Sequence, residues 1–255
     1  LSELHDSFFM PQLKLTKRFG FGENNFNLAI SFDDKQIYAK GEVQVQFSFY
    51  DHEDPEQRAI KASQDEIIFC IGEVLSNDKS LLKDFNQFVK TKKYLRQNFD
   101  SAVGVRRKTL DDFSLRNKNK LADLKQLFAN AFKSAPVISA QQVLKEGVLT
   151  SGDAKARYDE ALKLHFSSMY KKHDLAKTYA TTSDGLKTAA TSGQTSLDKS
   201  LSTAEGEVDT WLNLMDGAST VADVVKEFSR APYGWRDIAI LHILIMIGRK
   251  EQRRY

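Results

Sequence analysis

The sequence has 255 residues, of which 41% are hydrophobic and 28% charged, a composition typical of a globular protein rather than of a disordered chain. Its one cysteine, Cys70, excludes an intrachain disulfide and favours a reducing, cytoplasmic setting. No apolar run reaches the roughly 18 residues that a membrane span needs. The chain begins without a methionine and ends without a stop signal, so we expect a fragment of a longer protein.

Alternating apolar residues predict strands in the first part of the chain. The alternation covers residues 26–32 and 43–49, with a candidate turn at 33–35, so we expect an antiparallel hairpin or meander. The continuous apolar run at 67–71 predicts a strand buried on both faces. We therefore expect residues 1–76 to form a β-rich portion.

Helical spacing of apolar residues begins near residue 80. It predicts one long helix, a break at Gly104 and a second helix over 110–133. The apolar pairs within 137–144 suit a small hairpin, after which a third helix follows. Residues 77–178 are thus expected to form a helical region with a small hairpin.

A segment rich in Ser, Thr, Ala and Gly at 179–206 predicts a domain boundary. Three short helical segments follow within 207–255, and a tight connection joins the last two. This pattern is typical of a helix-turn-helix bundle, here truncated, and a winged-helix domain would place its wing after Tyr255. The fold class we predict is α+β: a β-rich N-terminal portion, central helices and a C-terminal helix-turn-helix-like bundle.

Motifs for catalysis and nucleotide binding are missing from the sequence. No Gly-Lys dipeptide occurs, so the chain has no P-loop, and Gly20-Phe21-Gly22 fails as a dinucleotide loop because Asn25 occupies the third glycine position. The five histidines lack metal-ligand spacing, and one cysteine cannot build a zinc-thiolate site. We therefore predict no catalytic, cofactor or metal site in this chain.

Positive charge is concentrated between residues 83 and 125, where twelve Lys and Arg against five Asp give +7, while the remainder of the chain carries −4. Such a cluster is suited to nucleic-acid phosphates or an acidic partner. The alternative is a solvated surface whose cations complement a helix dipole. The candidate contacts are Lys90, Lys92, Lys93 and Arg96 at the end of the first long helix, and Arg106, Arg107 and Lys108 in the connection after it.

Two segments resemble a known family. Lys92-Lys93-Tyr94-Leu95-Arg96-Gln97-Asn98 is similar to a K-x-K/E-Y-I/L-R-Q segment of the large P-loop ATPase of bacterial phage-exclusion (BREX) systems. Phe228 to Trp235, which contains Pro232-Tyr233-Gly234-Trp235, resembles an F-x-x-x-P-Y-G-W stretch of the same family. The order and spacing of these landmarks fit over residues 10–255.

The resemblance implies a region C-terminal to the ATPase module of an antiviral defence protein. ATP and Mg²⁺ are then implied for that missing module and not for this chain. The function expected is non-catalytic coupling to partner subunits or DNA. Two alternatives remain open: a sequence-tolerant DNA-binding module and a structural oligomerisation segment. The partners implied are other phage-defence proteins, with double-stranded DNA as a further candidate, oligomerisation through the parent protein and no membrane.

The Pro-Tyr-Gly-Trp motif also has a physical interpretation. Pro232 sets the exit of one helix, Gly234 permits a tight turn, and Trp235 can fill the junction with the next helix. We expect a buried turn that locks two helices together; a direct DNA contact is the alternative.

Overall fold

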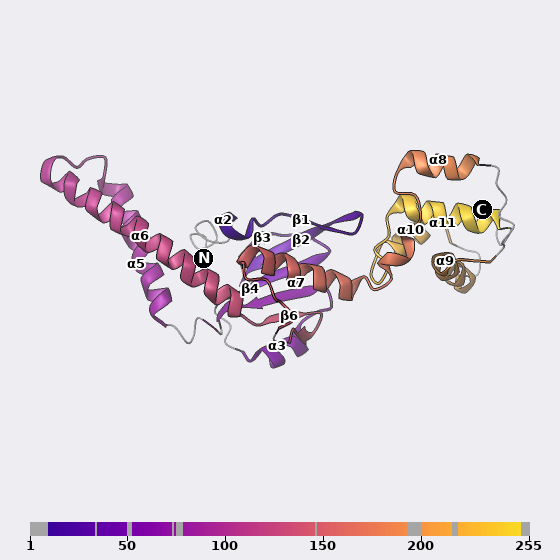
Figure 1. Ribbon diagram of the computed structural model, residues 1–255, viewed down its shortest axis with the longest axis horizontal. Coiled ribbons are helices and arrows are strands. Elements are labelled where there is room, and N and C mark those ends of the chain that lie inside the picture. The colour runs from indigo at the N-terminus through magenta and orange to yellow at the C-terminus, as the bar shows by residue number, and fades with distance from the viewer. Residues whose placement is uncertain are drawn as a thin grey trace. The chain divides into compact units, whose positions relative to one another are not determined.

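The computed structural model divides the chain into two compact units, which are described separately (Figure 1). Unit 1 comprises residues 1–19 and 26–165, and unit 2 comprises residues 20–25 and 166–255. The structure describes residues 10–33, 35–49, 53–72, 74, 79–145, 147–192, 200–215 and 219–250.

Unit 1 is built on a mixed sheet with the strand order β1-β2-β4-β5-β6-β7, and β3 pairs with β2 beside this path. The pair β6 and β7 is the small hairpin predicted near residue 140, and it extends the main sheet because β6 pairs with β5 in antiparallel register. The strands are β1 (Arg18–Phe21), β2 (Asn24–Phe32), β3 (Lys35–Tyr38), β4 (Val43–Ser48), β5 (Glu66–Cys70), β6 (Val137–Ser139) and β7 (Gln142–Val143).

The predicted antiparallel pairing of the first two long strands is wrong. β2 and β4 run parallel, with Leu28 opposite Val43 and Phe32 opposite Phe47. The antiparallel partner that follows β2 in the chain is β3, which returns along β2 and leaves the opposite side of β2 open to β4. Alternation fixes which residues face the core but carries no information on strand direction, because the side-chain period is the same in both cases.

The core of unit 1 lies on the face of the sheet that receives the aromatic side chains. Phe32, Phe47 and Phe69 stack from neighbouring strands, with ring centroids 4.9 Å and 5.2 Å apart. Phe132 and Tyr158, from two different helices, pack on Phe69 at 5.1 Å and 5.7 Å. β5 is buried on both faces, as predicted, because Ala59 and Ala62 of a short helical segment cover Ile68 and Cys70 on the other side. The helices are α2 (Met10–Leu13), α3 (Pro55–Lys61), α5 (Lys79–Asn98), α6 (Gly104–Ser134) and α7 (Ala154–Met169).

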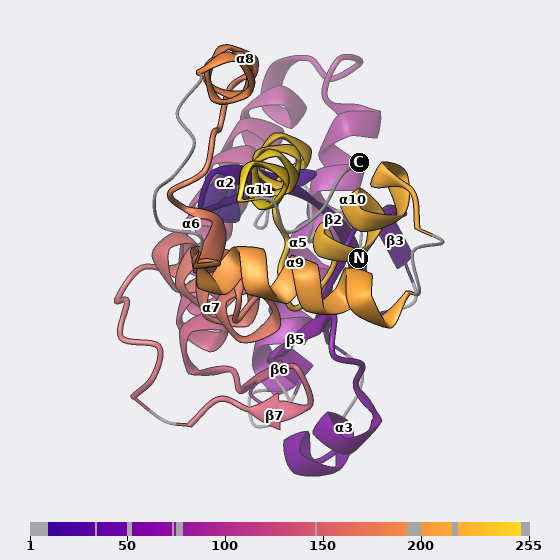
Figure 2. The ribbon, with the colours of Figure 1, turned by 90° about the vertical axis from the view of Figure 1, so that its right-hand side faces the viewer.

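Unit 2 is helical, and α11 lies at its centre (Figure 2). α11 packs against α8, α9 and α10, and Ile240, Ile243 and Ile247 are fully buried there. The α+β class is confirmed. The predicted wing would lie after Tyr255, outside the described residues. The elements of unit 2 are η2 (His173–Ala176), α8 (Ser183–Thr191), α9 (Thr203–Leu214), α10 (Val221–Phe228) and α11 (Asp237–Arg249).

Among the helices of the described residues, none is both long enough and apolar enough to cross a membrane.

Candidate functional site

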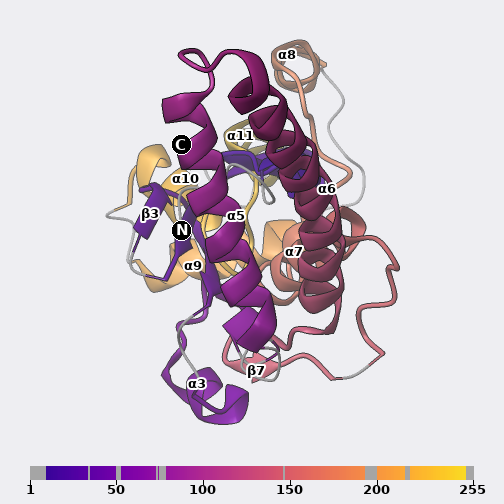
Figure 3. The ribbon, with the colours of Figure 1, turned by 90° about the vertical axis from the view of Figure 1, so that its left-hand side faces the viewer.

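The basic residues singled out in the sequence lie on a helical hairpin of unit 1, which we call the arm. It consists of α5 and the part of α6 that lies beside it, running in the opposite direction (Figure 3). Phe85 and Phe128 meet edge to face at 5.4 Å near one end, and Arg106 Nη2 donates to Asn98 Oδ1 at 3.0 Å near the other. The antiparallel arrangement therefore brings the end of α5 and the start of α6 together.

The length of α6 separates this basic end from the sheet. Phe132 near the end of α6 packs on Phe47 and Phe69 in the core. Arg106 precedes Phe132 by 26 residues in one continuous helix, which corresponds to about 39 Å at 1.5 Å per residue. The arm tip, which we define as residues 99–105, consequently lies far from the core of unit 1.

Three of the predicted contacts share one side of α5 and form what we call the cationic face: Lys92, Lys93 and Arg96. Arg96 follows Lys93 by three residues and Lys92 by four, the two spacings that make side chains neighbours on a helix. With Val89 and Gln97 they line a shallow hollow of about 320 Å³. The polar side chains that line this hollow are mostly cationic.

Most of the cations at this end are not used to hold the arm together. Among the described residues, no acidic side chain lies within 4.0 Å of Lys90, Lys93, Arg96 or Lys108. By contrast Lys120, on the same arm, forms an ion pair with Asp84 at 2.9 Å. Lys90, Lys93, Arg96 and Lys108 are therefore available to an external anion.

The prediction that Arg106, Arg107 and Lys108 lie in a connection is wrong: they lie in the first five residues of α6, which begins at Gly104 with φ +59°. A helix dipole disfavours cations at this end and favours them at the end of α5. Arg107 is offset by its contacts with Phe99, donating to the carbonyl oxygen at 2.8 Å and stacking 3.8 Å above the ring. Arg106 is tied to Asn98, whereas Lys108 is exposed without such a contact among the described residues.

The Pro-Tyr-Gly-Trp motif lies in unit 2, between α10 and α11, and the predicted burial of Trp235 is confirmed. Its side chain is 2% exposed, stacks on Phe228 at 5.2 Å, and donates from Nε1 to the carbonyl oxygen of Lys172 at 3.0 Å. Gly234 has φ +61°, and a Cβ there would lie 2.5 Å from the ring of Tyr170. A side chain at position 234 would therefore be strained and would collide. The motif is completed by Pro232 and Tyr233.

Tyr233 belongs to a second polar cluster of unit 2, which the sequence did not reveal. Its hydroxyl donates to Glu207 Oε2 at 2.7 Å, and Lys172 Nζ donates to Glu207 Oε1 at the same distance. The bond from Lys172, followed by that from Tyr233, lowers the pKa of Glu207 below its usual range. Burial and the bond to Glu207 raise the pKa of Tyr233. Every polar group of the cluster therefore has a partner inside the protein.

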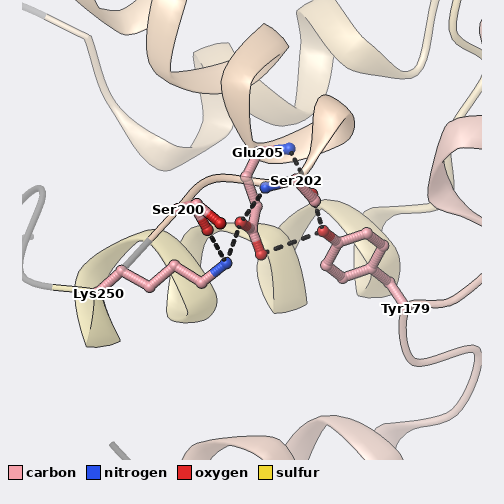
Figure 4. Close-up of polar contacts among 5 residues, drawn as sticks. All are labelled: Tyr179, Ser200, Ser202, Glu205 and Lys250. Carbon is pink, nitrogen blue, oxygen red and sulfur yellow. Dashed lines mark hydrogen bonds and ion pairs between the residues drawn. The ribbon is translucent and has the colours of Figure 1, made fainter. Parts of the chain in front are cut away.

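A buried ion pair joins the start of α9 to the end of α11 (Figure 4). Lys250 Nζ donates to Glu205 Oε2 at 2.6 Å, and the two side chains belong to residues that are 9% and 2% exposed. Tyr179 donates to the other oxygen of Glu205 at 3.1 Å, and burial raises the pKa of Tyr179 to about 12. Ser202 and Glu205 form a capping box, whose Ser-x-x-Glu spacing is the signal that could have located Glu205 in the sequence.

The two units thus hold their charged residues differently. In unit 2 the charged and polar groups named above are paired within the helical core, which indicates a structural role. On the arm, Lys90, Lys93, Arg96 and Lys108 face solvent. Within the described residues, no three His, Cys, Asp or Glu side chains come close enough together to hold a metal ion.

A protein-family model described as "BREX ATP-binding protein BrxC 4th domain with six-stranded beta sheet" matches residues 2–164. The match covers well over half of the chain and ends beside His165, the last residue of unit 1. The sheet of the described residues has seven strands, of which six form the path β1-β2-β4-β5-β6-β7 and the seventh, β3, pairs with β2 beside it. No curated protein and no solved structure matches the chain.

Proposed function

We propose, since the chain belongs to the family of the fourth domain of the BREX ATP-binding protein BrxC, that it is a non-catalytic contact module of such a protein. Family membership implies a role in BREX phage defence and an ATP-binding parent. In this proposal ATP and Mg²⁺ are bound by another part of the parent in the cytoplasm, and this chain couples it to DNA or to other BREX proteins.

The observation that carries the proposal is the cationic face of the arm. Lys92, Lys93 and Arg96 are spaced to meet successive negative charges, and Lys90 and Lys108 are exposed on the same end of the arm. A polyanion with regularly spaced charges gains affinity from each such contact without any sequence readout. Double-stranded DNA has this charge pattern, and we propose it as the ligand of the arm.

Unit 2 is less suited to DNA. In a helix-turn-helix the second helix enters the major groove and needs an exposed face. α11 packs against three helices, and Asp237 is its only exposed residue among those described. This exposed residue therefore offers the DNA backbone no cation. We therefore assign the DNA contact to the arm rather than to the predicted helix-turn-helix, and treat the winged-helix interpretation as the weaker one.

A partner subunit is the second candidate, and a separate feature favours it. Val103 and Val105 at the arm tip are each 82% exposed, and Tyr94 is 48% exposed nearby on α5. Exposed apolar side chains beside a charged surface are typical of protein contacts. The arm tip and the cationic face are close enough to serve one partner or two.

Charge reversal tests the proposal. The triple variant Lys92→Glu, Lys93→Glu, Arg96→Glu should bind a duplex of about 30 base pairs roughly tenfold or more weakly than the wild type at low salt. Fluorescence anisotropy of a labelled duplex provides the affinity. Since Lys93 and Arg96 form no ion pair among the described residues, we expect the thermal stability to change little.

The matched control is Lys171→Glu, Lys187→Glu, Lys226→Glu, which makes the same change in net charge at exposed lysines of unit 2. It should bind DNA nearly as well as the wild type. An equal loss of DNA affinity in both triple variants would contradict the proposal, because the loss would then come from the change in net charge alone. If Val103→Ser and Val105→Ser instead abolish binding to another BREX protein, that result would favour the partner-subunit candidate.

A further inference from the structure

Unit 2 contains a cavity that plays no part in the DNA contact proposed above. Its volume is about 330 Å³, at the lower end of the range typical of small-molecule sites. Four short segments of unit 2 line it: the turn between β1 and β2, η2, residue 181 and the start of α11. Its floor is apolar, formed by Ala176, Trp235 and Ala239.

The rim of the cavity is polar and carries charges of both signs. Lys177 and Arg236 supply two cations, and Glu23 on the β1–β2 turn supplies one acid. Lys177 is engaged with Asp174 at 2.7 Å, whereas Arg236 makes only a long bond of 3.4 Å from Nη1 to the carbonyl oxygen of Thr181. Arg236 therefore retains donors for a bidentate anion, as a guanidinium favours.

The start of α11 adds backbone donors at the same place. Arg236 is the N-cap residue, and no side chain caps the helix. Among the described residues, no group accepts from the N–H groups of Asp237, Ile238 and Ala239. Unpaired N–H groups together with the helix dipole favour an anion at this end.

His173 is an independent sign of a ligand. It lines the cavity although its residue is only 8% exposed. Nδ1 is paired with the carbonyl oxygen of Tyr233 at 3.2 Å, while Nε2 has no hydrogen-bond partner in the described part of the chain. A Cβ on Gly22 would lie 2.4 Å from this Nε2, so the β1–β2 turn approaches the imidazole closely and a side chain at position 22 would collide with it. A largely buried imidazole with one unpaired nitrogen at a cavity wall calls for an explanation, and a bound ligand supplies one.

We propose that this cavity binds a small organic anion, a carboxylate or phosphate monoester on a flat apolar body. The anionic group lies between Arg236 and the first N–H groups of α11, the apolar body lies on Trp235 and Ala176, and His173 Nε2 meets a polar atom of the ligand. The β1–β2 turn closes one side, where Asn24 donates from Nδ2 to the carbonyl oxygen of Gly234.

The test uses the full 255-residue chain and the side-chain N–H resonances of its two tryptophans. Trp235 lies in the cavity wall and Trp211 does not, so Trp211 is an internal control. The probes are benzoate, phenyl phosphate and uncharged benzyl alcohol. We expect one or both anions to shift the Trp235 signal with saturation, and the stronger of the two identifies the carboxylate or the phosphate as the preferred group.

Two variants with opposite expected effects separate binding from unfolding. Arg236→Gln should lower the affinity for the anion by about tenfold, since it removes a charge-assisted pair. Glu23→Gln should raise the affinity for the anion by roughly twofold, since it removes a repelling charge at the surface. Lys187→Gln, on α8 away from the cavity, should leave the affinity unchanged. An unshifted Trp235 signal with both anions, an equal response to benzyl alcohol, or unchanged affinity in Arg236→Gln would overturn the proposal. None of these outcomes affects DNA binding by the arm.

Discussion

The arm of unit 1 and the helical core of unit 2 both place lysines beside tyrosines, yet the surroundings differ. On α5, Lys93 and Tyr94 face solvent, and Lys93 has no ion-pair partner among the described residues. In unit 2, Lys172 and Tyr233 meet on Glu207, and Lys250 is buried against Glu205. The same residue types therefore act as structural links in one region and as free surface charge in the other.

This difference separates stability from binding. Removing one partner of a buried, paired charge leaves the other unsatisfied in a low-dielectric interior, which destabilises the fold. Removing an exposed, unpaired lysine changes stability little but weakens attraction to an anion. Substitutions in unit 2 should therefore change the free energy of unfolding, whereas substitutions on the arm should change the affinity for DNA.

The largest expected effect on stability is that of Trp235→Ala. The ring is only 2% exposed and packs on Phe228 and Tyr233, and a large-to-small change of this kind costs about 3–5 kcal/mol. Tyr233→Phe keeps the ring and loses one hydrogen bond, so it should cost only about 1 kcal/mol. Denaturant titration followed by circular dichroism measures both. Intact stability in Trp235→Ala with lost DNA binding would instead make the ring a contact residue.

The buried ion pair should show strong coupling. Lys250→Met alone leaves the carboxylate of Glu205 without its cation and should cost about 3–5 kcal/mol. The double variant Glu205→Leu, Lys250→Met removes both charges and should recover most of that loss. A double-mutant cycle from the same denaturant titrations gives the coupling. Additive losses would show that the pair contributes nothing beyond its two separate side chains.

A pH effect is expected in unit 1, where His165 of α7 is fully buried and hydrogen-bonded through Nδ1 to Ser139 at 3.0 Å. Burial lowers the pKa of His165 to about 4, below the usual 6.5, so the unfolded chain binds the proton more tightly. Stability should be fully present above pH 6.5 and should fall by about 3 kcal/mol as the pH drops toward 4. His165→Asn should flatten the profile over this window; an unchanged profile would assign the loss to other groups.

Local patterns predicted the elements of the fold well, because they depend on neighbouring residues. The alternation in 26–32 and the apolar run in 67–71 correspond to β2 and β5, and the spacing after residue 80 corresponds to α5. Strand direction and sheet membership depend on contacts distant in sequence. The parallel pairing of β2 with β4 and the addition of β6 and β7 to the main sheet therefore could not be derived from the pattern.

The candidate site was located in part from sequence. Charge density identified the basic residues of α5, but the antiparallel packing of α6 was needed to bring Lys108 to the same end. The partners of Lys172 and Lys250 are 35 and 45 residues away in the chain, so no spacing rule connects them. The cavity beside Trp235 also joins distant segments, and Gly22 was seen only as part of a failed dinucleotide loop.

The salt dependence of DNA binding by the cationic face tests the central claim most directly. Each phosphate neutralised adds about 0.9 to the slope of log affinity against log salt concentration, so the neutral triple variant Lys92→Gln, Lys93→Gln, Arg96→Gln should lower the slope by about 2 to 3. Lys171→Gln, Lys187→Gln, Lys226→Gln should leave it at the wild-type value. A slope that is identical in all three proteins would contradict the account, since the arm would then make no phosphate contacts.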